Sequence, residues 1–368
     1  MKKMSKQTRK TGSSVSAGIS VSWKAIAGAF AILAATGMTV SAFSAQNVSG
    51  AKDSLSVVAA IFPAYDWARE VIGDNTETAD LTLLLDSGVD LHSYQPTVDD
   101  ILTISNCDVF IYVGGESDAW VTDALSQAAN EDMQVIRLMD VLKDSVKEEE
   151  LVEGMQAGDD HESHEHGSGE EESDDHESAE DGEEAAEETP EYDEHVWLSL
   201  KNAKILTDAI AQALEEADPD NAEAYSENAQ AYMDKLTALD EEYQKAALAG
   251  ERDTILFADR FPFRYLMDDY DLNYYAAFAG CSAETEASFE TILFLAGKAD
   301  ELELPVILTI DGSDQTIAEA VINSTNAKDQ KILSMNSMQS ITAGDMEDGT
   351  SYLSVMEENL EVLKEALS

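Results

Sequence analysis

Residues 54–73 read SLSVVAAIFPAYDWAREVIG, an apolar run followed at once by a helical segment. The run over 54–62 is rich in valine and other large apolar residues, as buried strands are. Pro63 suits the first turn of a helix, and Gly73 suits a helix end. A strand that passes directly into a helix is the repeating unit of a parallel sheet covered by helices.

The same alternation recurs on both sides of a long helical region at 198–250. Strands are expected at 78–86, 107–115 and 134–140 before it, and at 254–260, 273–278, 305–312 and 331–337 after it. We therefore predict an α/β fold with two lobes, each with a mainly parallel sheet flanked by helices, joined by one long rigid helix. The expected segments are 1–50 (signal peptide or N-terminal anchor), 51–215 (first lobe), 216–250 (connecting helix) and 251–368 (second lobe).

The formal net charge of the 368-residue chain is −53, which excludes nucleic acid and anionic lipid as natural partners. Much of this charge is local, because residues 148–194 contain 23 Asp or Glu and no Lys or Arg. That segment has too few apolar residues to offset its ordering entropy, so we predict a disordered insertion in the first lobe.

The N-terminal segment has the pattern of an export signal. Several Lys and Arg precede residues 25–45, which carry no charge, and Val40-Ser41-Ala42 offers small residues for cleavage. An uncleaved anchor is the alternative, since about 20 uncharged residues can span a bilayer. No cysteine precedes Cys107, so we expect no lipid-modified cysteine beside this segment. We expect an exported protein, on the outer face of the cytoplasmic membrane or secreted.

Candidate metal ligands stand at the ends of predicted strands. His92 follows the strand at 78–86, Asp259 ends the strand at 254–260, and Asp311 ends the strand at 305–312. His195 opens the apolar sequence after the acidic insertion. In α/β sheets ligands bind at the carboxyl ends of strands, and imidazole with carboxylate suits a divalent transition metal. Taken singly, each of these residues could equally be a surface histidine or a helix cap.

Two motifs resemble those of the solute-binding proteins of zinc and manganese ABC importers. They are DLHSYQPTVDD (90–100) and DEHVWLSL (193–200), and VGGESDAW (113–120) and SYLSVMEENL (351–360) extend the resemblance. The resemblance covers residues 54–368. It implies one metal between two α/β lobes, with His92 and His195 as ligands from the first lobe and Asp311 as a carboxylate from the second. It also implies the membrane permease of an ABC importer as partner, and we expect a monomer.

The chain departs from this family where a third histidine is expected, because Ala258 stands there. Asp259 or a water molecule could complete the site. Cys281 and Glu284, which follow the strand at 273–278, are less certain candidates. A thiolate from Cys281 would favour Zn²⁺ over Mn²⁺, and Zn²⁺ is the expected cargo with Mn²⁺ as the alternative. In a further alternative Arg260 replaces a metal charge, and the cleft binds another ligand or none.

The acidic insertion contains the histidine-rich stretch HESHEHGSGEEESDDHE (161–177). Four histidines separated by glycine, serine and carboxylates can bind metal, but no apolar residues fix their geometry. We expect a weak accessory site that attracts metal to the cleft; a solvated loop without a specific role is the alternative. Its histidines are His161, His164, His166 and His176.

Two functions of other classes compete with metal capture for import. An extracellular zinc metallohydrolase could use His92, His195 and Asp311 with an open position for water. A surface adhesin could hold the metal for structural reasons only. No general base and no nucleophile–base pair is evident by motif, so the sequence favours a binding protein that is not an enzyme.

Overall fold

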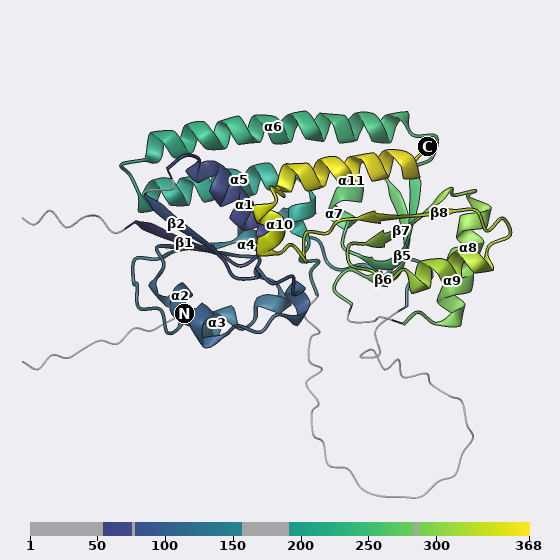
Figure 1. Ribbon diagram of the computed structural model, residues 1–368, viewed down its shortest axis with the longest axis horizontal. Coiled ribbons are helices and arrows are strands. Elements are labelled where there is room, and N and C mark those ends of the chain that lie inside the picture. The colour runs from purple at the N-terminus through teal and green to yellow at the C-terminus, as the bar shows by residue number, and fades with distance from the viewer. Residues whose placement is uncertain (1–53, 76–77, 157–190, 283–285) are drawn as a thin grey trace, which may run out of the picture. The chain divides into compact units, whose positions relative to one another are not determined.

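The computed structural model describes residues 54–75, 78–156, 191–282 and 286–368. Within these ranges the chain forms two four-stranded parallel sheets flanked by helices, which confirms the predicted fold class (Figure 1). Contacts group residues 52–368 in one unit. No helix in the described ranges is both long and apolar enough to cross a membrane. The predicted export signal lies outside the described residues.

The first lobe holds the sheet with strand order β2-β1-β3-β4. The strand β1 lies between β2 and β3, because its Val57 pairs with both Leu81 and Val109. The strands are β1 (Leu55–Ala59), β2 (Ala79–Leu83), β3 (Val109–Tyr112) and β4 (Gln134–Arg137). The helices are α1 (Phe62–Ile72), α2 (Val98–Asn106), α3 (Val121–Leu125), α4 (Leu138–Leu142) and α5 (Leu200–Ala217). Short 3-10 turns are η1 (Leu91–Ser93), η2 (Glu116–Asp118), η3 (Lys143–Ser145) and η4 (Val196–Leu198).

The second lobe repeats this arrangement with strand order β6-β5-β7-β8. The strands are β5 (Thr254–Phe261), β6 (Asn273–Ala279), β7 (Val306–Ile310) and β8 (Lys331–Met335). The helices are α7 (Arg264–Asp269), α8 (Phe289–Glu301), α9 (Thr316–Ser324), α10 (Ala343–Glu347) and α11 (Tyr352–Ala366). In each sheet the strand that comes first along the chain, β1 or β5, has neighbours on both sides. The connections from such a strand leave in opposite directions, which opens a crevice at the carboxyl ends of the strands.

The long helix is α6 (Ala222–Ala249), 28 residues that begin at the first lobe and end at the second (Figure 1). Its buried residues recur every three or four positions, which places them on one stripe. The stripe consists of Tyr225, Ala229, Tyr232, Leu236, Leu239 and Tyr243. Burial of one large apolar side chain contributes about 1.5–3 kcal/mol, so this stripe fixes α6 firmly against the other helices.

More than one segment joins the lobes. Helix α11 lies beside α6 (Figure 1). Its Tyr352 packs against Trp67 of α1 with ring centroids 5.2 Å apart. The Tyr352 N–H donates to Asp66, which is fully buried. The connection after η3 also crosses over, because Gln156 N donates to Ala277 O of β6 at 2.9 Å. The lobes are therefore held on several sides.

The two flanks of the acidic insertion pair with each other. Glu149 N donates to Glu191 O, and Asp193 N donates to Lys147 O, both at 2.9 Å. Residues 148–156 and 191–194 thus belong to the folded protein, although the sequence suggested disorder for the whole of 148–194. Their backbone groups find partners in each other and in β6, which a charge count does not reveal. The segment 157–190 lies outside the described residues.

Candidate metal centre

His92 is placed by the 3-10 turn η1, in the connection between β2 and α2. Asp90 caps this turn, since its Oδ1 accepts a hydrogen bond from His92 N at 3.0 Å. The Nδ1 atom of His92 lies 2.8 Å from Ser117 Oγ, which comes from the turn after β3. This contact orients the ring so that Nε2 faces the other lobe and His195.

His195 is fully buried and immediately precedes η4. Its Nδ1 lies 2.9 Å from Asp193 Oδ1, and the same carboxylate oxygen accepts its backbone N–H. A carboxylate beside Nδ1 accepts a hydrogen bond from Nδ1–H, so the ring proton stays on Nδ1 and the lone pair of Nε2 is free for a cation. The sequence Asp-Glu-His therefore supplies both a metal donor and the group that orients it.

The Nε2 atoms of His92 and His195 lie 3.3 Å apart. A tetrahedral zinc ion bound at about 2.0–2.1 Å by two imidazoles holds their nitrogens about 3.3 Å apart. The two rings are therefore already spaced for a shared zinc ion, although they come from residues 103 positions apart.

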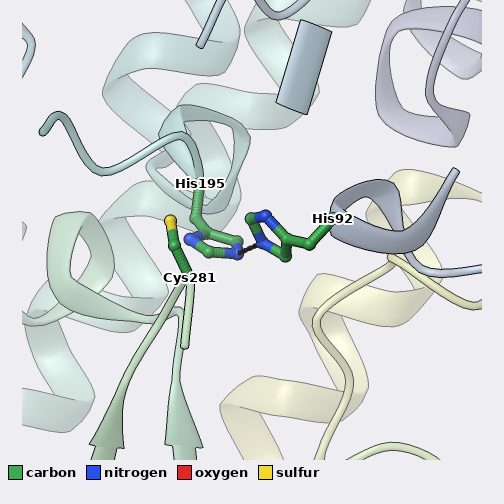
Figure 2. A group of neighbouring side chains, drawn as sticks. All are labelled: His92, His195 and Cys281. Atoms are coloured by element: carbon green, nitrogen blue, oxygen red, sulfur yellow. Dashed lines mark hydrogen bonds between the residues drawn. The ribbon is translucent and has the colours of Figure 1, made fainter. Parts of the chain in front are cut away.

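Cys281 completes a group of three donors from both lobes (Figure 2). It follows β6, and the ligand atoms of His92, His195 and Cys281 all lie within 4.8 Å of one another. Zinc bound to one thiolate and one imidazole separates sulfur from nitrogen by about 3.6 Å. The limit of 4.8 Å on the separations within the group is thus close to the spacing that a shared zinc ion requires.

Gly280 allows this close approach of the lobes. A Cβ atom at Gly280 would lie 2.9 Å from Phe261 O and 3.1 Å from the His195 ring. The carbonyl belongs to the backbone of β5 and cannot move cheaply. Glycine is therefore the residue that fits between Cys281 and His195.

Carboxylates surround the donor group and make it attractive to a cation. Asp193 and Glu194 are each only 2 % exposed. Glu194 Oε1 accepts the N–H of Ser117 at 2.8 Å, and its Oε2 lies 3.8 Å from His92 Nδ1 with no hydrogen-bond partner among the described residues. Glu149 Oε1 accepts the N–H of Cys281 at 2.9 Å. Buried charges of one sign are costly without a counter-ion, and a divalent metal supplies one.

The titration of the donors follows from these surroundings. Burial, with the neighbouring His195, lowers the pKa of His92 to about 4. Burial also disfavours charge on His195, but the Asp193 carboxylate outweighs it and raises the pKa of that ring. Burial, with the charge of Glu149, raises the pKa of the Cys281 thiol. At neutral pH the His92 ring is thus ready to bind metal, whereas Cys281 must lose a proton to do so.

The two aspartates proposed from the sequence contact groups of the second lobe instead of the donor group. Asp259 accepts hydrogen bonds from Arg260 N and, at 3.4 Å, from Ile310 N of β7. Asp311 accepts bonds from Ser337 N, Ser337 Oγ and Ser340 Oγ, so it orders the loop after β8. Both carboxylates lie at strand ends and accept hydrogen bonds from groups of the second lobe.

The remaining sequence candidates are placed as follows. Ala258 packs in the core between β5 and the helices of the second lobe. Glu284 and the four histidines of the acidic insertion lie outside the described residues. Sequence reasoning missed Ser117, Asp90, Glu149 and the roles of Asp193 and Glu194. The sequence marked Asp90, Asp193 and Glu194 only by their positions one or two residues before His92 or His195.

The fold and this site define a class: a two-lobe α/β binding protein with soft and borderline metal donors between its lobes. The model of the family described as "Zinc-uptake complex component A periplasmic" matches residues 57–366. The chain belongs to this family.

Individual relatives agree with the family. The chain is 28% identical over 321 residues to the zinc-binding lipoprotein AdcA of Streptococcus pneumoniae serotype 4, a match over 87% of this chain and 57% of AdcA. It thus spans little more than half of that relative. It is also 28% identical over 345 residues to the high-affinity zinc uptake system protein ZnuA of Bacillus subtilis, covering 93% of this chain and 96% of ZnuA.

Solved structures show the same fold. The Zn(II)-bound ZnuA-like domain of Streptococcus pneumoniae AdcA matches with a TM-score of 0.62 and 24% identity, over 85% of this chain and 99% of that domain. The metal-dependent lipoprotein YcdH of Bacillus subtilis matches with a TM-score of 0.64 and 24% identity, over 85% of this chain and 99% of YcdH.

Proposed function

We propose that this protein is an extracytoplasmic receptor that captures Zn²⁺ between its lobes and delivers it to the membrane permease of an ABC importer. The observation that carries the proposal is the donor group of His92, His195 and Cys281, with the two Nε2 atoms at 3.3 Å. Family membership and the zinc-related names of the relatives support the same cargo.

Zinc is the proposed cargo because of the donors. Imidazole suits zinc, carboxylate oxygens suit manganese, and a thiolate selects for the softer zinc ion. Neither Asp259 nor Asp311 adds an oxygen donor to the group. Manganese is therefore expected to bind far more weakly.

The proposed site has three protein donors and takes its fourth from water. Three protein ligands with an open position also occur in catalytic zinc sites, but family membership favours capture over hydrolysis. An open position lets an incoming ligand displace the water when the ion is passed on. We propose that the receptor acts as a monomer outside the cytoplasmic membrane.

The acidic, histidine-rich insertion is proposed as an accessory that raises the local metal concentration. Its support is the composition of 157–190 and the position of its flanks: Gln156 bonds to β6 near Cys281, and Glu191 precedes His195 by four residues. Metal attracted there is released beside the cleft.

The test is a zinc titration by competition with a chromogenic chelator, with manganese as competitor. One tight zinc site is expected in the full-length protein, and His92→Ala should abolish it. His176→Ala, the same change in the insertion, is the matched control and should leave the tight site intact. A protein without a tight site, or with one that survives His92→Ala, contradicts the proposal.

A further inference from the structure

An ion pair crosses between the lobes beside the donor group. Arg260 Nη2 donates to Asp90 Oδ2 at 2.8 Å. Arg260 stands near the end of β5 in the second lobe, and Asp90 immediately precedes η1 in the first. The two side chains are 21% and 22% exposed. A pair this sheltered is screened less than one on the open surface.

The same carboxylate holds the turn that carries His92. Asp90 Oδ1 accepts the His92 N–H, while Asp90 Oδ2 accepts the guanidinium. One side chain therefore connects the backbone of a first-lobe donor to the second lobe. Any displacement of the guanidinium is passed to η1 through a single rigid carboxylate.

A register shift in β5 directs Arg260 toward the first lobe. The pairing of β5 with β6 is regular up to Phe257 and resumes at Arg260, with an irregularity between them. Across this shift Ala258 enters the core, Asp259 bonds back to β7, and Arg260 reaches Asp90. Bulges of this kind re-aim a side chain next to functional sites.

We propose that Arg260 is a positioning residue: through Asp90 it sets where His92 stands relative to Cys281. This inference rests on the proposed function, because it concerns the same site. The metal would join His92 and His195 of the first lobe to Cys281 of the second. The ion pair joins the same two lobes, and Asp90 stands two residues before His92, so the donors are held close before the ion arrives. Donors that are ordered in advance cost less conformational entropy on binding.

The guanidinium also has an opposite effect, since a positive charge near the site repels a cation. The Asp90 charge offsets most of this repulsion because the two groups are paired. The two effects differ in sign when the charge is removed. Lost positioning weakens zinc binding, and lost repulsion strengthens it.

The experiment compares full-length wild type with Arg260→Gln, Asp90→Asn and the double variant. Asparagine at 90 retains the capping oxygen but removes the charge, so it tests the ion pair without removing the turn. Zinc affinity is measured by chelator competition. Lys331→Gln, which removes the exposed pair with Glu365 in the same lobe, is the matched control.

We expect each single variant to bind zinc about 10- to 100-fold more weakly, as for other groups that orient metal ligands. The zinc affinity of the double variant should be no lower than that of the single variant with the lower affinity, because all three variants lose the same interaction. Lys331→Gln should stay within about twofold of wild type, as expected for an exposed pair.

The absorption spectrum of the Co²⁺-loaded proteins gives a readout that a merely structural role would not move. In Arg260→Gln the sulfur-to-cobalt band should persist while the ligand-field bands change, because Cys281 stays bound and His92 is displaced. Unchanged affinity and spectrum, or tighter zinc binding, overturns the inference. Should wild type lack a tight site, the proposed function fails and the inference with it; a tight wild-type site that Arg260→Gln leaves unaltered refutes the inference alone.

Discussion

The side chains of Asp193 and His195 form one unit, in which Asp193 Oδ1 lies 2.9 Å from both the backbone nitrogen and the Nδ1 atom of His195. This double contact fixes the ring of a fully buried histidine and directs its other nitrogen at His92. The site is thus organised by the groups behind the donors as much as by the donors.

Asp193→Asn should weaken zinc binding by about 10- to 100-fold, because the ring of His195 loses the charge that fixes its tautomer and orientation. Zinc affinity by chelator competition measures the effect. Asp208→Asn, the same change on an exposed position of α5, is the control and should have no effect. If the two variants bound zinc with equal affinity, Asp193 would have no role in orienting His195 for metal binding.

Cys281→Ser should reduce zinc affinity by at least about tenfold and narrow the preference for zinc over manganese, because a hydroxyl replaces the soft donor. The Co²⁺ protein should also lose its sulfur-to-cobalt band. Cys107 is buried in the first lobe and serves as the matched control. If Cys107→Ser and Cys281→Ser give the same metal selectivity, Cys281 is not a ligand.

Gly280→Ala should destabilise the protein by about 1–3 kcal/mol, because its methyl group would lie 2.9 Å from Phe261 O and 3.1 Å from the His195 ring. Zinc affinity should fall as well, since the ring must move. Chemical denaturation and zinc competition measure the two effects.

Gly297→Ala provides the opposite control, because no atom lies within 4 Å of a Cβ at this position in α8. Alanine is a better helix former than glycine, so this change should stabilise by about 0.5–1 kcal/mol and leave zinc binding unaffected. If Gly280→Ala and Gly297→Ala destabilised the protein by similar amounts, the close contact expected for a methyl group at position 280 would be contradicted.

The metal-free protein should lose stability between pH 6.5 and pH 4 through His92. Burial, with the nearby His195, lowers its pKa to about 4 in the folded state, against about 6.5 when unfolded. The unfolded chain therefore binds the proton first as the pH falls, and the folded state loses up to about 3 kcal/mol over this range. His195, whose pKa is raised, acts in the opposite sense: its contribution is present below the unfolded value and lost as the pH rises.

Denaturation of wild type and His92→Gln at pH 7 and pH 4.5, both with chelator, separates the His92 contribution from that of other groups. The stability difference between the two pH values should be smaller in the variant. Identical differences would show that His92 does not titrate as its surroundings require.

Deletion of residues 159–189 should leave the tight zinc site and remove weaker additional binding. The flanks pair with each other through Glu149 and Glu191, so the fold should survive the deletion. Calorimetric titration gives the number and affinity of the sites. Loss of the tight site on deletion would move the receptor site from the cleft to the histidine-rich stretch.

The sequence predicted the fold because its signals are local. Strand-like runs such as 54–62 pass into helices that begin with Pro63 or a similar cap, and this alternation recurs in both lobes. The apolar stripe of α6 is equally a matter of spacing along the chain. What spacing did not reveal are the crossings by α11 and by residues 146–156, which depend on contacts between distant segments.

His92 and His195 could be chosen from their motifs and from their places after a strand and before a helix. In the sequence Cys281 was a less certain candidate than Asp259 and Asp311, although all three end or follow strands. The tertiary structure separated them: Asp259 and Asp311 find partners within the second lobe, while Cys281 faces both histidines. The sequence by itself determined which elements form, because propensity and periodicity act between neighbours. Only the tertiary structure decided which strand ends meet and how Arg260 reaches Asp90, because the packing of two lobes sets those distances.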